Sequence, residues 1–102
     1  MRIYNKLVRD NIPEIIKQKG ETAETCVLDD RKYHKYLCRK LKEEVFEYLQ
    51  SGETEELTDI AEVIDALAVL KGSSFEQVLE IKEQKAKKNG KFEKRIFLKS
   101  VK

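Results

Sequence analysis

The hydrophobic residues of this chain recur with a helical period over most of its length. In segment 29–52 the apolar side chains fall on one face of a helix, at Leu37, Leu41, Val45 and Tyr48. One proline and four glycines are the only strong interruptions, so long helices are expected. The pattern and its capping and stop residues predict helices within segments 5–20, 29–52, 53–72 and 73–90.

Two segments lack a helical period. The first, "ETAETCVL" at 21–28, is consistent with a loop or a short strand, and the pattern does not decide between them. The second, the C-terminal segment 91–102, alternates enough around Ile96 to Leu98 for a short strand that would pair with the first. The expected fold is mainly α: a helical bundle of four to five helices, with this strand pair as an option, completed by oligomerisation.

Length and composition narrow the class of protein. The 102 residues fit one domain, 1–102. Charged residues make up 39% of the chain, but the net charge is only +2, so neither nucleic acid nor a membrane is favoured as a partner. No apolar run approaches the roughly 18 residues of a membrane span. With no secretory leader, Cys26 and Cys38 are interpreted as free thiols, which predicts a cytoplasmic protein.

Acidic residues fall on the helix faces that should form the core. On a helical wheel, Glu44 and Glu47 border the apolar stripe of segment 29–52, whereas Glu43 points almost the opposite way. In the next helix, Glu56 lies within the apolar arc and Asp59 lies at its edge. The connection between the two helices is short, so they should be antiparallel neighbours. Two acidic pairs are therefore expected to face the interior.

Two interpretations of these acids stay open. Glutamate-rich helices usually expose their charges to solvent, and spacing alone gives that interpretation equal weight. Alternatively, four converging carboxylates would repel one another unless a divalent cation lay between them. Carboxylate oxygens suit Mg²⁺, with Mn²⁺ as an option. The position of Glu56 on an apolar arc slightly favours the metal.

At these residues the chain resembles a known family. "EEVFE" followed by "ELTD" is similar to the ExxE…ExxD motif of the all-α NTP pyrophosphohydrolases, the MazG-like and phosphoribosyl-ATP pyrophosphohydrolase-like proteins. "YNKLVRDNIPEII", "VLDD" and "KNGKFEKRIFL" resemble a small house-cleaning subgroup, so the likeness extends over almost the whole chain. One departure is that only eight residues separate Glu47 from Glu56, fewer than in MazG-like proteins, which suits a tighter turn.

The resemblance implies an oligomeric enzyme, a homodimer or homotetramer, that hydrolyses a nucleoside triphosphate to the monophosphate and pyrophosphate. The motif residues would hold Mg²⁺: Glu44, Glu47, Glu56 and Asp59. Glu43 would support them from outside the cluster. A carboxylate not fully engaged as a ligand, Glu47 ahead of Glu44, would accept the proton of the attacking water.

A triphosphate also needs cationic partners. Two stretches offer them, "NKLVRD" near the start and "KAKKNGKFEKR" near the end. The candidate substrate-binding residues are Asn5, Lys6, Arg9, Lys85, Lys88 and Arg95. For the lysines of the second stretch, a role in complementing the dipole at a helix end is an equal alternative.

Two competing functions remain beside the pyrophosphohydrolase that clears non-canonical nucleotides. One keeps the chemistry and takes phosphoribosyl-ATP as the substrate. The other is a non-enzymatic helical binding module whose basic tail touches nucleic acid, because Glu93 is the only acid after Lys85. The module gives no reason for the inward positions of Glu56 and Asp59.

Overall fold

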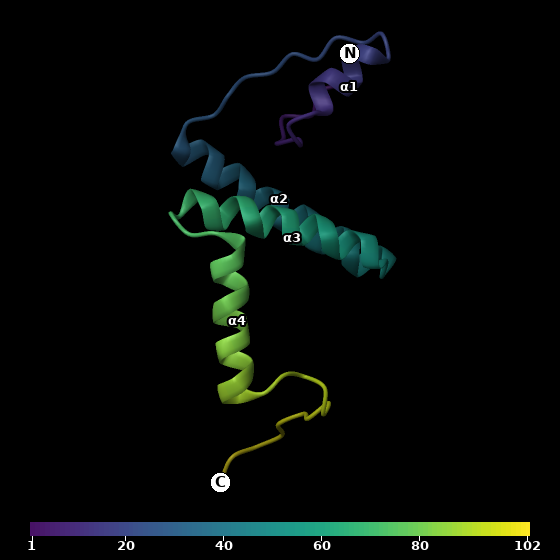
Figure 1. Ribbon diagram of the computed structural model, residues 1–102. Coiled ribbons are helices and arrows are strands. Elements are labelled where there is room, and N and C mark those ends of the chain that lie inside the picture. The colour runs from purple at the N-terminus through teal and green to yellow at the C-terminus, as the bar shows by residue number, and fades with distance from the viewer.

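The computed structural model describes residues 1–102 and contains four helices and no strand. The helices are α1 (Ile12–Gln18), α2 (Asp30–Ser51), α3 (Thr54–Leu70) and α4 (Phe75–Asn89). Figure 1 shows their order along the chain. The predicted all-α fold of about four helices is confirmed.

The optional strand pair is wrong. Neither segment 21–28 nor segment 91–102 forms a strand. The first connects α1 to α2 and the second follows α4, so they lie at opposite ends of the molecule (Figure 1). Two short strands are marginally stable even when adjacent, and here nothing brings them together.

Local capping fixes the helix ends. The Asp29 side chain accepts a hydrogen bond of 2.9 Å from the backbone N–H of Lys32 and begins α2. Gly52 ends α2 with φ of 68°, a left-handed conformation that glycine adopts without strain. Ser74 caps α4 by accepting from the N–H of Gln77. These ends lie where the sequence predicts them.

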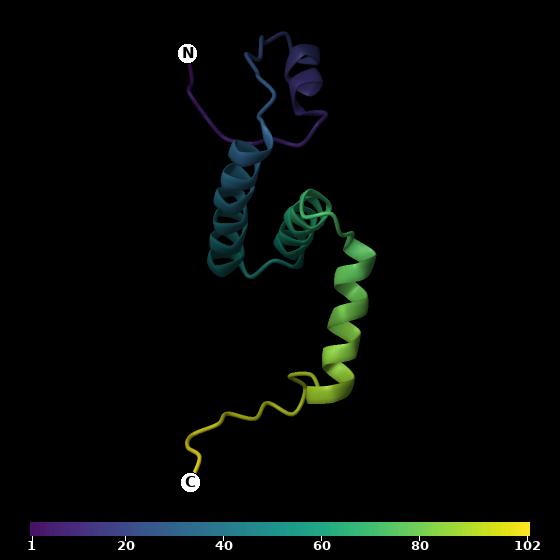
Figure 2. The same ribbon diagram turned by 90° about the vertical axis from the view of Figure 1, so that its left-hand side faces the viewer.

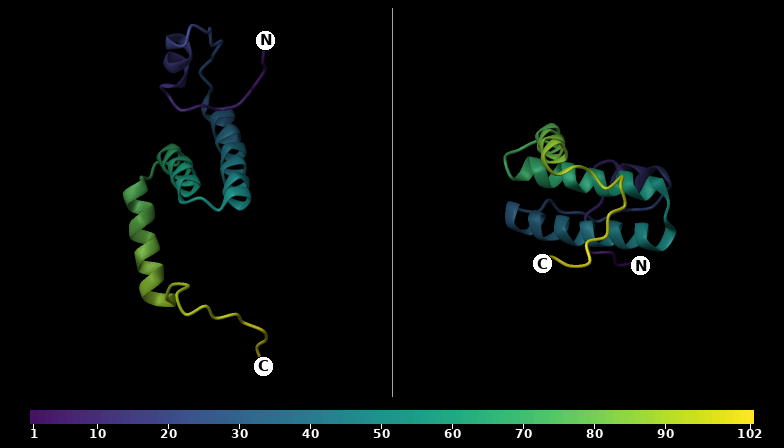
Figure 3. Two further views of the ribbon diagram at one scale, coloured as in Figure 1. Left: turned by 90° about the vertical axis from the view of Figure 1, so that its right-hand side faces the viewer. Right: turned by 90° about the horizontal axis from the view of Figure 1, so that it is seen from below.

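The central unit is the α2–α3 hairpin. Only Gly52 and Glu53 separate α2 from α3, and the two helices run side by side in Figure 1 and in the right-hand view of Figure 3. The small core lies in this unit, at Leu37 on α2 and at Val63 and Ala68 on α3. The hairpin therefore positions the residues of α2 and α3 relative to each other.

The remaining elements extend away from the hairpin. Among the other helices, α4 packs only against the end of α3, and α1 packs against no helix. Figure 2 shows α4 projecting from the hairpin, with the C-terminal segment beyond it. The radius of gyration is 18.0 Å, against about 13 Å for a compact domain of this length. Large apolar side chains consequently stay exposed on every helix, including Ile15, Phe46, Val69 and Leu79.

None of the four helices combines the length and the apolar content needed to cross a bilayer.

Candidate metal centre

Three of the four predicted metal ligands meet between α2 and α3. Carboxylate oxygens of Glu44, Glu56 and Asp59 all lie within 4.8 Å of one another. Glu44 comes from the middle of α2, and the other two lie one turn apart at the start of α3. The two-residue connection folds α3 back along α2. Acids that belong to two different helices are therefore brought to a single place.

Glu44 is the most unusual member of this group. Only 6% of its surface is exposed, and it is the only charged residue in the buried set. Its Oε1 lies 3.4 Å from Nζ of Lys40, one turn earlier on α2, whereas its buried Oε2 has no hydrogen-bond partner. A buried acceptor without a partner costs about 1–3 kcal/mol. Glu44 is therefore a buried carboxylate with one unpaired oxygen.

Burial raises the pKa of Glu44, and its hydrogen bond and charge repulsion with Glu47 raise it further. Lys40 acts in the opposite direction, because its positive charge favours the ionised carboxylate. The pKa therefore lies above the ordinary value for glutamate, since desolvation and the second acid outweigh the lysine. A cation at this position would reverse that balance by stabilising the charged form.

This raised pKa predicts how the stability of the metal-free protein varies with pH. The folded chain holds the Glu44 proton more tightly than the unfolded chain, so lowering the pH favours folding. We expect the free energy of unfolding to increase as the pH falls from neutral through the raised pKa, and to decrease as the pH rises through it. Urea titrations of the metal-free protein across this range measure the effect.

The Glu44→Gln variant is the matched control for this pH dependence. It should lose the gain on acidification and be more stable than the metal-free wild type at neutral pH, by on the order of 1 kcal/mol, since no buried charge remains. An unchanged pH dependence in this variant would assign the effect to another group.

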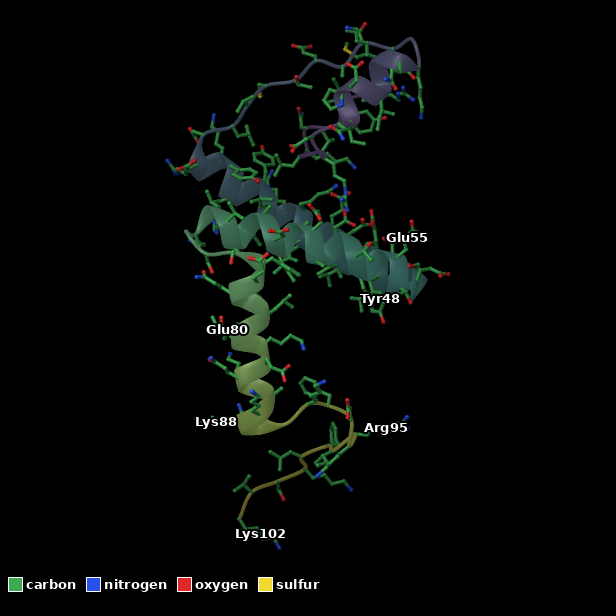
Figure 4. The ribbon with its side chains drawn as sticks, in the orientation of Figure 1. Tyr48, Glu55, Glu80, Lys88, Arg95 and Lys102 are labelled. Atoms are coloured by element: carbon green, nitrogen blue, oxygen red, sulfur yellow. The ribbon has the colours of Figure 1, made fainter.

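Cations from the N-terminal segment lie against the acids. Nη2 of Arg9 lies 2.8 Å from Oδ1 of Asp59, and its Nη1 lies 4.0 Å from Oε2 of Glu62. Lys6 pairs with Glu43 at 3.3 Å. In Figure 4, side-chain nitrogen and oxygen atoms gather where the N-terminal segment meets the hairpin. Two of the predicted substrate-binding residues, Lys6 and Arg9, are thus beside the acidic group.

The other acids of the motif surround the group of three. Glu47 lies close enough to Glu44 to raise its pKa, but it is outside the set of mutually close oxygens. Glu43 pairs with Lys6 and Lys40, which fits its predicted place outside the cluster. Asn5 precedes Lys6 with φ of 47°, and its side chain makes no hydrogen bond within the chain. Glu47 therefore lies beside the group of three rather than within it.

The predicted cations of the second stretch lie elsewhere. Lys85 and Lys88 belong to the last turns of α4, and Arg95 follows in the C-terminal segment. Figure 4 labels Lys88 and Arg95 far from the hairpin, and none of the three forms an ion pair. Within one chain, the structure does not bring these residues to the acids.

Two residues of the site were not among the sequence candidates. Lys40 neutralises Glu43 and Glu44, and its spacing of three and four residues from them was a signal that could have identified it. Glu62 offers Arg9 a second carboxylate, and its side chain is 61% exposed. Its position on the helical wheel is that of an ordinary solvated acid, so no signal in the sequence marks it.

The residues present fit a small divalent cation. All ligands are carboxylates, which Mg²⁺ and Mn²⁺ prefer, and Glu44 keeps one buried oxygen free. At metal–oxygen distances of about 2.1 Å, ligand oxygens are separated by roughly 3–4 Å, so the observed spread needs only small side-chain rotations to close.

No family profile, curated protein or solved structure matches this chain. The function is therefore inferred from the residues of the site and their geometry.

Proposed function

We propose that the protein is a Mg²⁺-dependent nucleotide pyrophosphohydrolase, which cleaves a nucleoside triphosphate to the monophosphate and pyrophosphate. The observation that supports it best is Glu44: a buried carboxylate with an unpaired oxygen, close to Glu56 and Asp59. The similarity to the ExxE…ExxD motif agrees with this geometry. The same proposal takes the working protein to be a cytoplasmic homodimer or homotetramer.

The charges of the site suit a metal–phosphate substrate. Six carboxylates lie in or beside the group, from Glu43, Glu44, Glu47, Glu56, Asp59 and Glu62. Only three cationic side chains oppose them, from Lys6, Arg9 and Lys40. The excess of negative charge attracts a divalent cation, and the two N-terminal cations are free to exchange a carboxylate partner for a phosphate.

Each residue then has a definite role. When bound at this group, Mg²⁺ would supply the positive charge that offsets a triphosphate and that lowers the pKa of a water molecule. Glu44, Glu56 and Asp59 would hold the metal, and Glu47 would accept the proton of the attacking water. The Arg9 guanidinium has five N–H donors, so it can keep Glu62 and still bind a phosphate oxygen.

A neighbouring cleft offers room for the rest of the nucleotide. It has a volume of about 490 Å³ and lies between the start of α2 and the second half of α3. Glu62, which lies 4.0 Å from Arg9, is part of its wall, so the cleft adjoins one candidate phosphate-binding side chain. Tyr33 adds an aromatic ring on which a base can stack.

The decisive test is a nucleotide panel. The protein is incubated with canonical and modified nucleoside triphosphates and with phosphoribosyl-ATP, with Mg²⁺ or with EDTA, and pyrophosphate release is measured. We expect Mg²⁺-dependent release that leaves the nucleoside monophosphate. Orthophosphate and a diphosphate as the products, or no release from any nucleotide, would refute the proposal.

A further inference from the structure

Every residue of the C-terminal segment, residues 91–102, is exposed. Its apolar side chains are almost fully in water, with Phe92 at 99% exposure and Phe97 at 84%. Within this segment, the only hydrogen bond between backbone groups joins the N–H of Arg95 to the carbonyl of Phe92. Five cations accompany these apolar residues, Lys91, Lys94, Arg95, Lys99 and Lys102, against a single acid, Glu93.

The end of the hairpin at which α2 connects to α3 has a surface of complementary charge. We call it the hairpin tip: the last turns of α2, the connection and the first turn of α3. Its exposed apolar residues are Phe46, Leu49 and Leu57. Glu53 and Glu55 lie among them, exposed and without an ion pair. From residue 43 to residue 70 the chain carries nine acids and no lysine or arginine.

These two surfaces lie apart within one chain. The hairpin tip is at the start of α3, marked in Figure 4 by Tyr48 and Glu55, whereas α4 leaves from the other end of α3. Helix α4 then carries the segment farther away by its 15 residues, a rise of about 22 Å. The cationic apolar segment and the anionic apolar tip are therefore complementary but separated.

We propose that the C-terminal segment of one copy binds the hairpin tip of a second copy, and that a two-fold axis makes the exchange reciprocal. Apolar side chains of the segment cover Phe46, Leu49 and Leu57, and its cations pair with Glu53 and Glu55. Two such contacts form a closed dimer, because each copy offers one segment and one tip.

The size of the contact is adequate for a stable pair. Five apolar side chains, two of them phenylalanine, remove roughly 600 Å² from water per segment. Two reciprocal segments, with the surfaces they cover, exceed the roughly 1,200 Å² at which specific interfaces begin. The complementary charges favour one orientation of the two copies and increase the rate at which they associate.

The exchange also concerns the candidate metal centre. Glu56 lies next to Glu55 in the first turn of α3, so a segment on the tip brings Arg95 toward the metal centre of the other copy. This consequence rests on the proposed function, because it assigns Arg95 to the phosphates of a substrate. The dimer itself does not depend on any catalytic activity.

A charge-exchange experiment on the full-length chain tests the dimer. The segment variant Lys94→Glu/Arg95→Glu and the tip variant Glu53→Lys/Glu55→Lys each place like charges across both contacts of a homodimer. Each alone should dimerise at least 10-fold more weakly than the wild type, as measured by sedimentation equilibrium at 150 mM salt. An equimolar mixture should recover the wild-type dimer, because both of its contacts are again complementary.

A second measurement identifies the residues of the two copies that are in contact. Protein labelled with ¹⁵N is mixed with unlabelled protein and treated with a carbodiimide, which joins lysine amines to carboxylates. We expect mixed-isotope peptides that link residues 91–102 to residues 53–55. Wild-type mass and affinity in both variants, failure of the mixture to recover, or links confined to one isotope would each overturn the proposal.

The same variants separate the dimer from other partners of a basic segment. If the wild type is a monomer whose segment binds duplex DNA, RNA or anionic vesicles at 150 mM salt, the proposal is wrong. Because mass and cross-links need no substrate, an inactive protein that still passes both tests would refute the proposed function alone.

Discussion

The Asp59→Asn variant should lose nearly all Mg²⁺-dependent pyrophosphate release. Asp59 contributes an oxygen to the group of three and also pairs with Arg9 at 2.8 Å, so this change affects both the proposed metal site and the proposed phosphate-binding cation. Loss of a metal ligand removes about 3–4 kcal/mol of transition-state stabilisation, which corresponds to a rate decrease of roughly 10²–10³-fold. Initial rates at saturating nucleotide and Mg²⁺ measure it.

Glu80→Gln is the matched control for this variant. Glu80 is an exposed carboxylate in the middle of α4, labelled in Figure 4, and it forms no ion pair. Its change to the amide should leave the rate within about twofold of the wild type. If Asp59→Asn keeps a rate similar to that of Glu80→Gln while remaining folded, Asp59 holds no catalytic metal.

Mg²⁺ should stabilise the wild-type protein strongly. At a free concentration 100 times the Kd, binding to the folded state alone adds about 2.7 kcal/mol to the free energy of unfolding. For a chain of this length that is a rise in Tm of roughly 10 °C or more. The physical origin is the relief of repulsion at Glu44, whose unpaired oxygen gains a positive partner.

The Glu44→Gln variant should lose most of this gain, because the amide is a poor ligand for Mg²⁺ and no longer needs a counter-charge. Thermal melts with Mg²⁺ and with EDTA, at constant ionic strength and protein concentration, separate metal binding from general salt screening. An equal rise in Tm for the wild type and for Glu44→Gln would show that the metal binds elsewhere.

Much of the fold could be predicted from the sequence, because the contacts that fix the helix ends are local. Asp29, Gly52 and Ser74 fix the ends of α2 and α4 through contacts within three or four residues, and such contacts leave a direct mark in the sequence. The short connection likewise predicted that α2 and α3 are neighbours. The separation of α4 from the hairpin was not predictable from the sequence. Every helix has an apolar face, and the sequence does not show which of these faces pack against each other.

The acidic site was predicted in composition and only partly in arrangement. The helical wheel put Glu56 deepest in the apolar arc, yet Glu44 is the buried acid and Glu56 is half-buried. A wheel describes one helix, whereas burial depends on the neighbour: α3 covers the border of α2 that carries Glu44. The pairing of Arg9 with Asp59, 50 residues away, had no local signal at all. The resemblance to the all-α pyrophosphohydrolases stays a prediction.

The acids and the cations of the site come together by different routes along the chain. Glu44, Glu56 and Asp59 belong to one helical hairpin, so their approach closes only a short loop. Lys6 and Arg9 must return from a segment separated from their partners by 37 and 50 residues. Contacts of low sequence separation form first, so a nascent chain should bring its carboxylates together while Lys40 is the only cation beside them, before Lys6 and Arg9 arrive. During that interval, free divalent cations in the surrounding solution are the most available source of compensating charge.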